Sequence, residues 1–380
     1  MKKSIFIFLL VFMISYLLFP VNSIFAEEAI EEKCFSYCVT DYSSGLILYA
    51  KNEHKKHEIG SMVKIMTLNI FFEELEKNTI SLDEEVYISD NAASMGGSQM
   101  FLDKNTSYKV SDLIKGIVVC SANDAAYAIG ERISGDINSF INLMNNKAKE
   151  YGMNNTLFAN STGLPSNKEQ YSTAFDINIA TKKLMEHDKY YDYAKIWYED
   201  FVHPSGRITR ITNTNKLLKR YNKCICAKTG YTNEAGFCIS AGAKKDDFKV
   251  ISTVIGGESS DDRFNAAISL FNRAFSTYST KLLYRKNEVI DQVNVIKGKE
   301  NQVNVYVDKD VSLLYKENEL ISDVQYNYSK DIEAPFLMNQ NIGYIEVKTG
   351  DNVEKVNVLT CKEIQKKGLF DYFSQILTKK

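Results

Sequence analysis

The spacing of hydrophobic residues changes twice along this chain, and these changes limit the folds that it can adopt. From Ser61 to Leu75 apolar residues recur every three or four positions, which is typical of a helix. Similar spacing predicts further helices over 111–119, 124–133, 137–151 and 263–277. Short β-rich runs occur before and after the helical middle, at 35–39, 46–50, 224–228, 236–241 and 249–255. This order of elements favours an α/β fold in which the first strands share a sheet with the later ones.

After Leu283 the apolar residues alternate with polar ones, as in strands that are buried on one face. The runs lie at 288–296, 302–307, 343–347 and 353–359. They predict a small all-β domain. We therefore expect a main domain over 27–282, a β-rich domain over 283–360 and a C-terminal segment over 361–380.

The N-terminus has the layout of a secretory signal peptide. Two lysines follow Met1, an apolar run extends from Ile5 to Phe19, and Ala26 precedes an acidic pair. A retained transmembrane anchor is the alternative, but the run is short for a span. We expect cleavage near residue 26, so that the mature protein is exported.

Composition excludes several classes of function. The formal net charge is −2, so no overall field favours nucleic acid. Seven cysteines without a C-x-x-C pair predict buried thiols, although one disulfide stays open. His54 and His57 lack the spacing of a metal-binding helix, and we expect neither a metal nor a cofactor.

Ser61 and Lys64 form the only Ser-x-x-Lys sequence in the chain, at the start of a predicted helix. Three residues are almost one helical turn, so both side chains lie on one face. A serine hydroxyl becomes a good nucleophile when a neutral amine can take its proton. A helix-capping serine followed by a surface lysine is the alternative, and this short motif needs partners to exclude it.

A second candidate element is Ser121-Ala-Asn123, between two predicted helices. Its hydroxyl and amide can face one cleft, where the first relays a proton and the second holds a substrate amide. Ser89-Asp-Asn91 has similar residues, but it follows a strand-like run, where we expect a turn.

The third element is Lys228-Thr229-Gly230, at the end of a β-rich run. There Lys228 supplies a cation, Thr229 a hydroxyl for a carboxylate, and Gly230 room for close backbone approach. Lys348-Thr-Gly350 repeats the letters, but we expect a hairpin turn at that position.

In this order the three elements match the set found in penicillin-binding proteins and serine β-lactamases. The surrounding sequence resembles the low-molecular-weight D-alanyl-D-alanine carboxypeptidases related to penicillin-binding protein 5, over nearly the whole mature chain. The resemblance rests on Gly60–Thr67, Val119–Ala126, Ser161–Leu164 and Ala227–Thr232. It implies an antiparallel sheet flanked by helices, with a helical subdomain, followed by a small all-β domain.

The resemblance also implies roles in the removal of the terminal D-alanine from peptidoglycan stem peptides. Ser61 is the expected nucleophile, Lys64 its base and Ser121 the proton relay to the leaving group. The expected substrate-binding residues are Asn123, Lys228, Thr229, Gly230, Tyr231 and Arg263. The backbone N–H groups of Ser61 and Tyr231 are expected to form the oxyanion hole, and β-lactams to acylate the same serine.

Two positions depart from the family pattern, because Thr214 stands where some relatives have arginine and Tyr231 where some have histidine. Arg263 matches an arginine that contacts the terminal carboxylate in similar enzymes, although a surface salt bridge is an alternative.

The segment from Leu369 to Leu377 has the pattern of an amphipathic helix, which predicts an anchor on the outer face of the cytoplasmic membrane. Packing of this helix on the β-rich domain is the alternative. For the activity, the rivals are a serine β-lactamase and a penicillin or peptidoglycan sensor that does not turn over.

Overall fold

The computed structural model describes residues 32–371, which form two compact units. Within that range the first unit comprises residues 32–40, 47–244 and 250–274, and the second comprises 41–46, 245–249 and 275–371. The predicted signal peptide and most of the predicted C-terminal helix lie outside the described residues.

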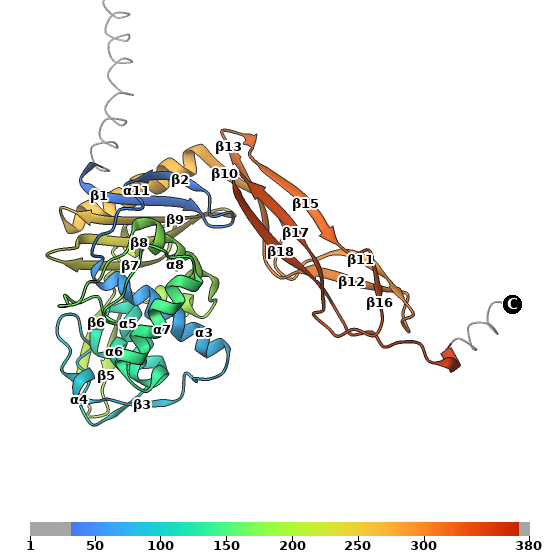
Figure 1. Cartoon of the computed structure of the whole chain (residues 1–380). Helices are drawn as coiled ribbons and strands as arrows, with labels where there is room; N and C mark the ends of the chain where they lie inside the picture. Colours follow the sequence, from blue (N-terminus) through green and yellow to red (C-terminus); the bar gives the residue numbers. More distant parts are fainter. Residues whose placement is uncertain (1–31, 372–380) are drawn as a thin grey trace, which may run out of the picture. The chain divides into compact units, whose positions relative to one another are not determined.

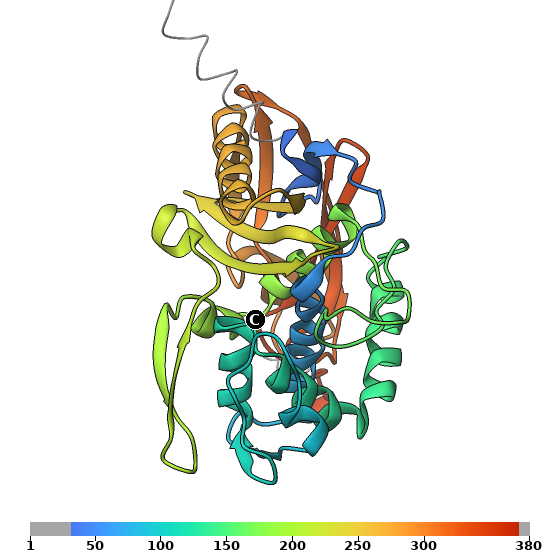
Figure 2. The ribbon, with the colours of Figure 1, turned by 90° about the vertical axis from the view of Figure 1, so that its left-hand side faces the viewer.

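A five-stranded sheet forms the centre of the first unit, in the order β2-β1-β9-β8-β7. Its strands are β1 (Cys34–Asp41), β2 (Ile47–Lys51), β7 (Cys224–Thr232), β8 (Gly236–Lys245) and β9 (Phe248–Gly257). The N-terminal strands therefore share a sheet with the later ones, as predicted. The helix α11 (Ser260–Thr277) covers one face of this sheet, and the helical region lies on the opposite side (Figures 1 and 2).

The predicted helices are present, with bounds that differ by a few residues at most. The helical elements are η1 (Gly60–Val63), α3 (Lys64–Glu76), α4 (Asp90–Ala93), α5 (Val110–Val119), α6 (Asn123–Ser134), α7 (Ile137–Glu150), α8 (Ala174–Glu186), α9 (Tyr190–Ala194) and α10 (Leu217–Arg220). α6 ends at Gly135, whose φ of +81° suits glycine. α7 begins where the side chain of Asp136 accepts hydrogen bonds from the backbone of Asn138 and Ser139.

Two short antiparallel ribbons complete the first unit. β3 (Glu85–Tyr87) pairs with β4 (Ser107–Lys109), and β5 (Tyr198–Val202) pairs with β6 (Ile208–Thr212). Ser89 caps α4 by accepting a hydrogen bond from the backbone of Ala92. The polar group at 89–91 is therefore a helix start and not the turn that we expected, and either role is local.

The second unit is built of strands, as the alternating pattern predicted. They are β10 (Tyr278–Tyr284), β11 (Val289–Ile296), β12 (Gln302–Val307), β13 (Val311–Lys316), β14 (Glu319–Leu320), β15 (Ser322–Tyr328), β16 (Asp331–Glu333), β17 (Asn341–Thr349) and β18 (Asn352–Thr360). Alternate valines such as Val303 and Val305 point into one hydrophobic core. β17 and β18 form a hairpin in which Thr349 pairs with Asn352, so Lys348 and Thr349 end a strand and the predicted hairpin turn begins at Gly350.

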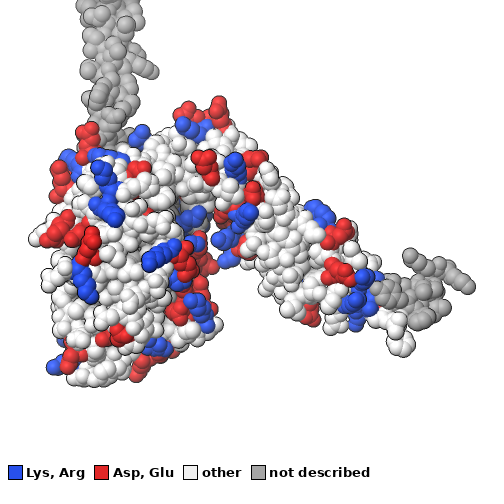
Figure 3. All heavy atoms as spheres, viewed as in Figure 1, with Lys and Arg blue, Asp and Glu red and all other residues white. Residues whose placement is uncertain are grey.

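The surface and the thiols agree with the composition. Figure 3 shows acidic and basic side chains interspersed on the face in view, as expected for a net charge of −2. Cys38, Cys120, Cys224, Cys238 and Cys361 are free thiols, and the prediction of buried thiols holds for Cys38 and Cys238, whereas the other three are only partly buried. In the part of the chain between residues 32 and 371, no helix is long and apolar enough to span a membrane.

Candidate active site

Ser61 lies in the short helix η1, directly before α3. Gly60 has a φ of +51°, and this backbone conformation places the serine at the start of the helical turn that leads to Lys64. The Nζ atom of Lys64 donates hydrogen bonds to Oγ of Ser61 at 2.9 Å and to the carbonyl oxygen of Thr162 at 2.7 Å. The predicted nucleophile and base are therefore in direct contact.

The environment of Lys64 favours the neutral amine. Its side chain is completely buried, and burial lowers its pKa well below the usual value. The nearby charge of Lys228 lowers this pKa further. A neutral Nζ can accept a proton, so the geometry and the electrostatics both suit a general base.

Ser121 occupies the tight connection between α5 and α6. Its φ of +63° is unusual for a residue other than glycine, and such backbone strain gathers at functional sites. Its Oγ accepts a 2.7 Å hydrogen bond from Nζ of Lys228. Ser121 of the α5–α6 connection and Lys228 of β7 are therefore in direct contact.

Asn123, the first residue of α6, has an acceptor atom without a partner in residues 32–371. Its Nδ2 donates a 2.7 Å hydrogen bond to the carbonyl of Gly96, while its Oδ1 is buried and finds no hydrogen-bond partner among the described residues. Buried polar atoms are nearly always paired. The amide of a bound peptide can donate to this oxygen only if the atoms that enclose it move aside.

Lys228 and Thr229 lie side by side on β7, the outer strand of the sheet. Burial, followed by the charge of Arg263, lowers the pKa of Lys228 to about 7. The hydroxyl of Thr229 donates to the hydroxyl of Thr214 at 2.9 Å. A lysine cation and two hydroxyl groups are suited to a carboxylate.

Glycines bring the backbone close to Ser61 from two sides. A Cβ atom on Gly163 would lie 1.9 Å from the carbonyl oxygen of Gly60, and one on Gly230 would lie 2.2 Å from that of Ile59. A Cβ on Gly60 would lie 2.8 Å from the backbone nitrogen of Tyr231. The Tyr231 N–H is thus next to the residue that precedes the serine, where an oxyanion donor is needed.

The side chains of Tyr231 and Arg263 lie differently from the others. The Tyr231 ring is half exposed and stacks on Phe237 with 4.3 Å between ring centroids. Arg263 is buried, and its Nη1 donates to the carbonyl oxygens of Gly230 at 2.9 Å and Cys238 at 3.2 Å. Arg263 is therefore in contact with the backbone of the site strands.

Two supporting residues were not among the predicted site residues. Thr162 acts through its backbone carbonyl, which any residue type supplies. Asp124 accepts hydrogen bonds from the backbone of Met100, Leu102 and Ala125, and so fixes the loop beside Asn123. A buried acidic residue directly after the Ser-x-Asn motif was the available hint.

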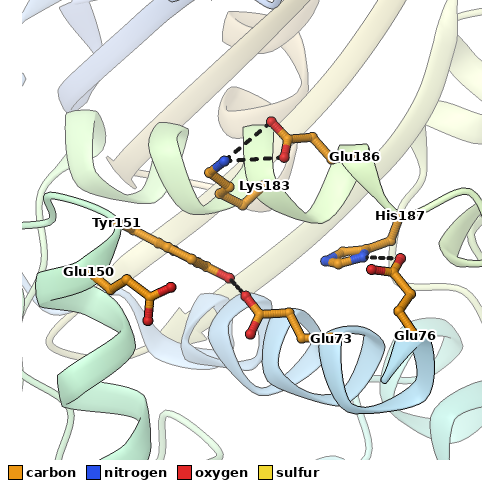
Figure 4. A pocket seen from close by; sticks show the side chains of 7 residues that line it. All are labelled: Glu73, Glu76, Glu150, Tyr151, Lys183, Glu186 and His187. Carbon is orange, nitrogen blue, oxygen red and sulfur yellow. Dashed lines mark hydrogen bonds and ion pairs between the residues drawn. The ribbon is translucent and has the colours of Figure 1, made fainter. Parts of the chain in front are cut away.

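A hollow of about 400 Å³ lies elsewhere in the first unit (Figure 4). Its lining residues are Glu73, Glu76, Glu150, Tyr151, Lys183, Glu186 and His187. They include none of the predicted site residues. His187 contacts Glu76 at 2.7 Å and Lys183 pairs with Glu186 at 3.2 Å, so these polar side chains already have partners.

The comparisons with known proteins agree with this geometry. A family model described as D-alanyl-D-alanine carboxypeptidase matches residues 23–259. The chain belongs to the D-alanyl-D-alanine carboxypeptidase family. In this member of the carboxypeptidase family, a second model, described as penicillin-binding protein 5, C-terminal domain, matches residues 278–366. The predicted family and fold class are confirmed.

Relatives of this carboxypeptidase family member are similar over most of their length. D-alanyl-D-alanine carboxypeptidase DacF of Bacillus subtilis (strain 168) is 35% identical over 351 residues, which cover 92% of this chain and 89% of that protein. D-alanyl-D-alanine carboxypeptidase DacC of Escherichia coli (strain K12) is 29% identical, with 93% and 90% covered.

Solved structures extend the same likeness. Penicillin-binding protein 5 from Haemophilus influenzae is 26% identical, has a TM-score of 0.67 and covers 88% of this chain and 98% of its own. Penicillin-binding protein D2 from Listeria monocytogenes, in an ampicillin-bound form, is 28% identical with a TM-score of 0.58. It covers 64% of this chain and 98% of its own.

Proposed function

We propose that the protein is a serine-type D-alanyl-D-alanine carboxypeptidase, which removes the terminal D-alanine from peptidoglycan stem pentapeptides through an acyl-enzyme on Ser61. The observation that carries this proposal is the 2.9 Å hydrogen bond between Ser61 and the buried Lys64, whose pKa is lowered by burial and by the charge of Lys228. Family membership and the relatives named as carboxypeptidases support the same reaction.

In the acylation step, Oγ of Ser61 bonds to the carbonyl carbon of the penultimate D-alanine while its proton passes to Nζ of Lys64. The negative oxygen of the tetrahedral intermediate accepts hydrogen bonds from the N–H groups of Ser61 and Tyr231. The carbon–nitrogen bond then breaks, and the nitrogen of the leaving D-alanine takes a proton relayed through Ser121.

In the second step, water attacks the ester carbonyl and Lys64 accepts a proton from the water. The ester carbon–oxygen bond then breaks, Oγ of Ser61 takes the proton back from Lys64, and the shortened peptide leaves. The other residues hold the peptide. Asn123 accepts from a substrate amide, Lys228 and Thr229 bind the terminal carboxylate, and Gly230 lets β7 approach Ser61 closely.

The test is release of D-alanine from a purified pentapeptide, compared between the native protein and Ser61→Ala. We expect release by the native protein only. Labelling with a fluorescent penicillin, lost in Ser61→Ala, identifies the nucleophile. Fast hydrolysis of penicillin with no release of D-alanine would instead show a β-lactamase, and labelling without either turnover would show a sensor.

We further propose that β-lactams acylate Ser61, since a relative of known structure is described as ampicillin-bound. The strained amide of these drugs takes the place of the D-alanyl-D-alanine bond, and no second amine diffuses away. The acyl-enzyme is therefore expected to persist longer than the peptide ester.

For location, we propose export by the segment 1–26 and attachment to the membrane surface by the segment that begins near Leu369. Leu369 and Phe370 are strongly exposed at the end of the described chain, which suits an apolar surface partner. Flotation with vesicles should carry the protein that ends at Lys380 and not one that ends at Lys367. Equal flotation of both would contradict the proposed anchor.

A further inference from the structure

Arg263 is placed behind the site and not inside it. The residue is 8% exposed, and its guanidinium lies between the rings of Phe237 and Phe264, 5.4 and 4.9 Å from their centroids. Its Nε atom is enclosed without a hydrogen-bond partner among the described residues. A carboxylate therefore cannot reach Nε unless the packing of these rings changes.

The hydrogen bond that Arg263 donates acts on a peptide group that lies next to the segment of Ser61. Nη1 donates to the carbonyl oxygen of Gly230, and this carbonyl belongs to the same planar peptide group as the N–H of Tyr231. The bond between Gly230 and Tyr231 is trans, so its carbonyl and its N–H point to opposite sides of the strand. Arg263 binds the carbonyl oxygen on one side of the strand, and Gly60 lies next to the nitrogen of Tyr231 on the other.

A cation that binds a carbonyl has two effects on the peptide group. It fixes the plane of the group, and it draws electron density toward the oxygen, which makes the N–H a stronger donor. The second Nη1 contact, to Cys238 of the paired strand, fixes the guanidinium itself. β7 is an outer strand, so the edge that carries the N–H of Tyr231 is not paired with a further strand of the sheet and faces the segment around Gly60 and Ser61.

We propose that Arg263 is a positioning residue that orients and polarises the Gly230–Tyr231 peptide, so that the N–H of Tyr231 stabilises the oxyanion formed at Ser61. This inference rests on the proposed function, because it needs an acyl-enzyme on Ser61. It differs from the carboxylate contact that the resemblance implied for Arg263. The charge of Arg263 also lowers the pKa of Lys228, so Arg263 influences Lys228 as well as the N–H of Tyr231.

The test compares benzylpenicillin with its methyl ester, whose carboxyl group is neutral, in the native protein, Arg263→Met and Arg263→Lys. We expect Arg263→Met to lower the acylation rate about tenfold for both compounds, less than the ~10²–10³ typical for loss of a whole oxyanion donor. Arg263→Lys, which can reach one carbonyl, should restore part of the rate. With a pentapeptide, kcat should fall and KM should not rise, because loss of the Arg263 charge leaves Lys228 more readily protonated.

The infrared band of the acyl-enzyme carbonyl gives a direct signature of the hydrogen bond. A weaker donor raises the stretching frequency, so the band should shift upward in Arg263→Met and less in Arg263→Lys. Arg220→Met is the matched control, because Arg220 also packs on Phe264, at 5.3 Å, but pairs with Asp261 at 2.8 Å. It should leave the rates and the band unchanged.

Three results would overturn the inference. They are a loss confined to the compound with a free carboxylate, a rise in KM at constant kcat, or an unshifted carbonyl band. If Arg263→Met does not fold, Arg263→Lys alone decides between these outcomes. A native protein that penicillin does not acylate would refute the proposed function itself, so the two failures are distinguishable.

Discussion

Lys228 donates a 2.7 Å hydrogen bond to the hydroxyl of Ser121, a residue 107 positions earlier in the chain. The same lysine lowers the pKa of the buried Lys64, which contacts Ser61. One lysine on the outer strand therefore influences both the proposed proton relay, Ser121, and the proposed base, Lys64, and several measurable effects depend on its charge.

The pH dependence of activity should have its upper limit near pH 7. The pKa of Lys228 is lowered to about 7, so as the pH rises through that value the residue loses the charge that we propose attracts the substrate carboxylate. We expect KM for a pentapeptide to rise above pH 7. In Lys228→Arg the side chain stays charged, so this rise should move to higher pH. An unchanged profile in that variant would show that another group sets the limit.

The same lysine should lower the stability of the folded protein at neutral pH. Its pKa falls from 10.5 to about 7 on folding, so the unfolded chain binds more protons between these values and stability rises with pH across this window. Lys228→Met removes the effect, and it should raise Tm at pH 7 by more than at pH 10. Thermal unfolding of both proteins at the two pH values is the measurement. The exposed Lys168→Met serves as control and should change neither value.

Two replacements of Ser121 separate catalysis from backbone strain. Ser121→Ala and Ser121→Gly both remove the hydroxyl, and both should lower kcat by ~10²–10⁴. At the observed φ of +63° only glycine is relaxed, so Ser121→Gly should be more stable than Ser121→Ala by about 1 kcal/mol. Urea unfolding of the pair gives the difference. Equal stabilities would mean that the strain is not present in solution.

Alanine at two glycines with similar φ should have unequal consequences. A Cβ on Gly152 (φ +78°) would have nothing within 4 Å, so Gly152→Ala should cost only about 1 kcal/mol of conformational strain. A Cβ on Gly163 (φ +82°) would overlap the carbonyl oxygen of Gly60. Gly163→Ala should therefore be less stable and should slow acylation of Ser61. Penicillin acylation together with Tm measures both effects.

The parts of the site that could be predicted from the sequence are those in which the side chain itself does the chemistry. Ser61 and Lys64 are one turn apart, so local spacing was enough to place them together. Ser121 and Lys228 are far apart in the sequence, and only the order of motifs shared with a known family brought them together. The main helices and the β-rich unit could be predicted from the spacing of hydrophobic residues, because the side chains that are buried in the core recur with the period of the helix or strand that carries them.

Backbone groups could not be predicted in the same way. The carbonyl of Thr162 binds Lys64 whatever side chain residue 162 carries, so no residue type marks this contact.

The helix α8 was not predicted, although Thr173 caps its start by accepting a hydrogen bond from the backbone of Asp176. For Arg263 the sequence indicated a position in a family pattern, but its direction toward two carbonyls depends on tertiary packing.

The close backbone contact between Gly163 and Gly60 has a consequence for natural variation. No side chain fits at Gly163 without moving the carbonyl of Gly60, so every point mutation there disturbs the nucleophile's own segment. Lineages under drug selection would lose enzyme activity together with drug binding if they changed this position. Heritable changes in drug affinity should instead accumulate at open positions such as Tyr231, whose side chain is 51% exposed and can vary while the backbone stays in place.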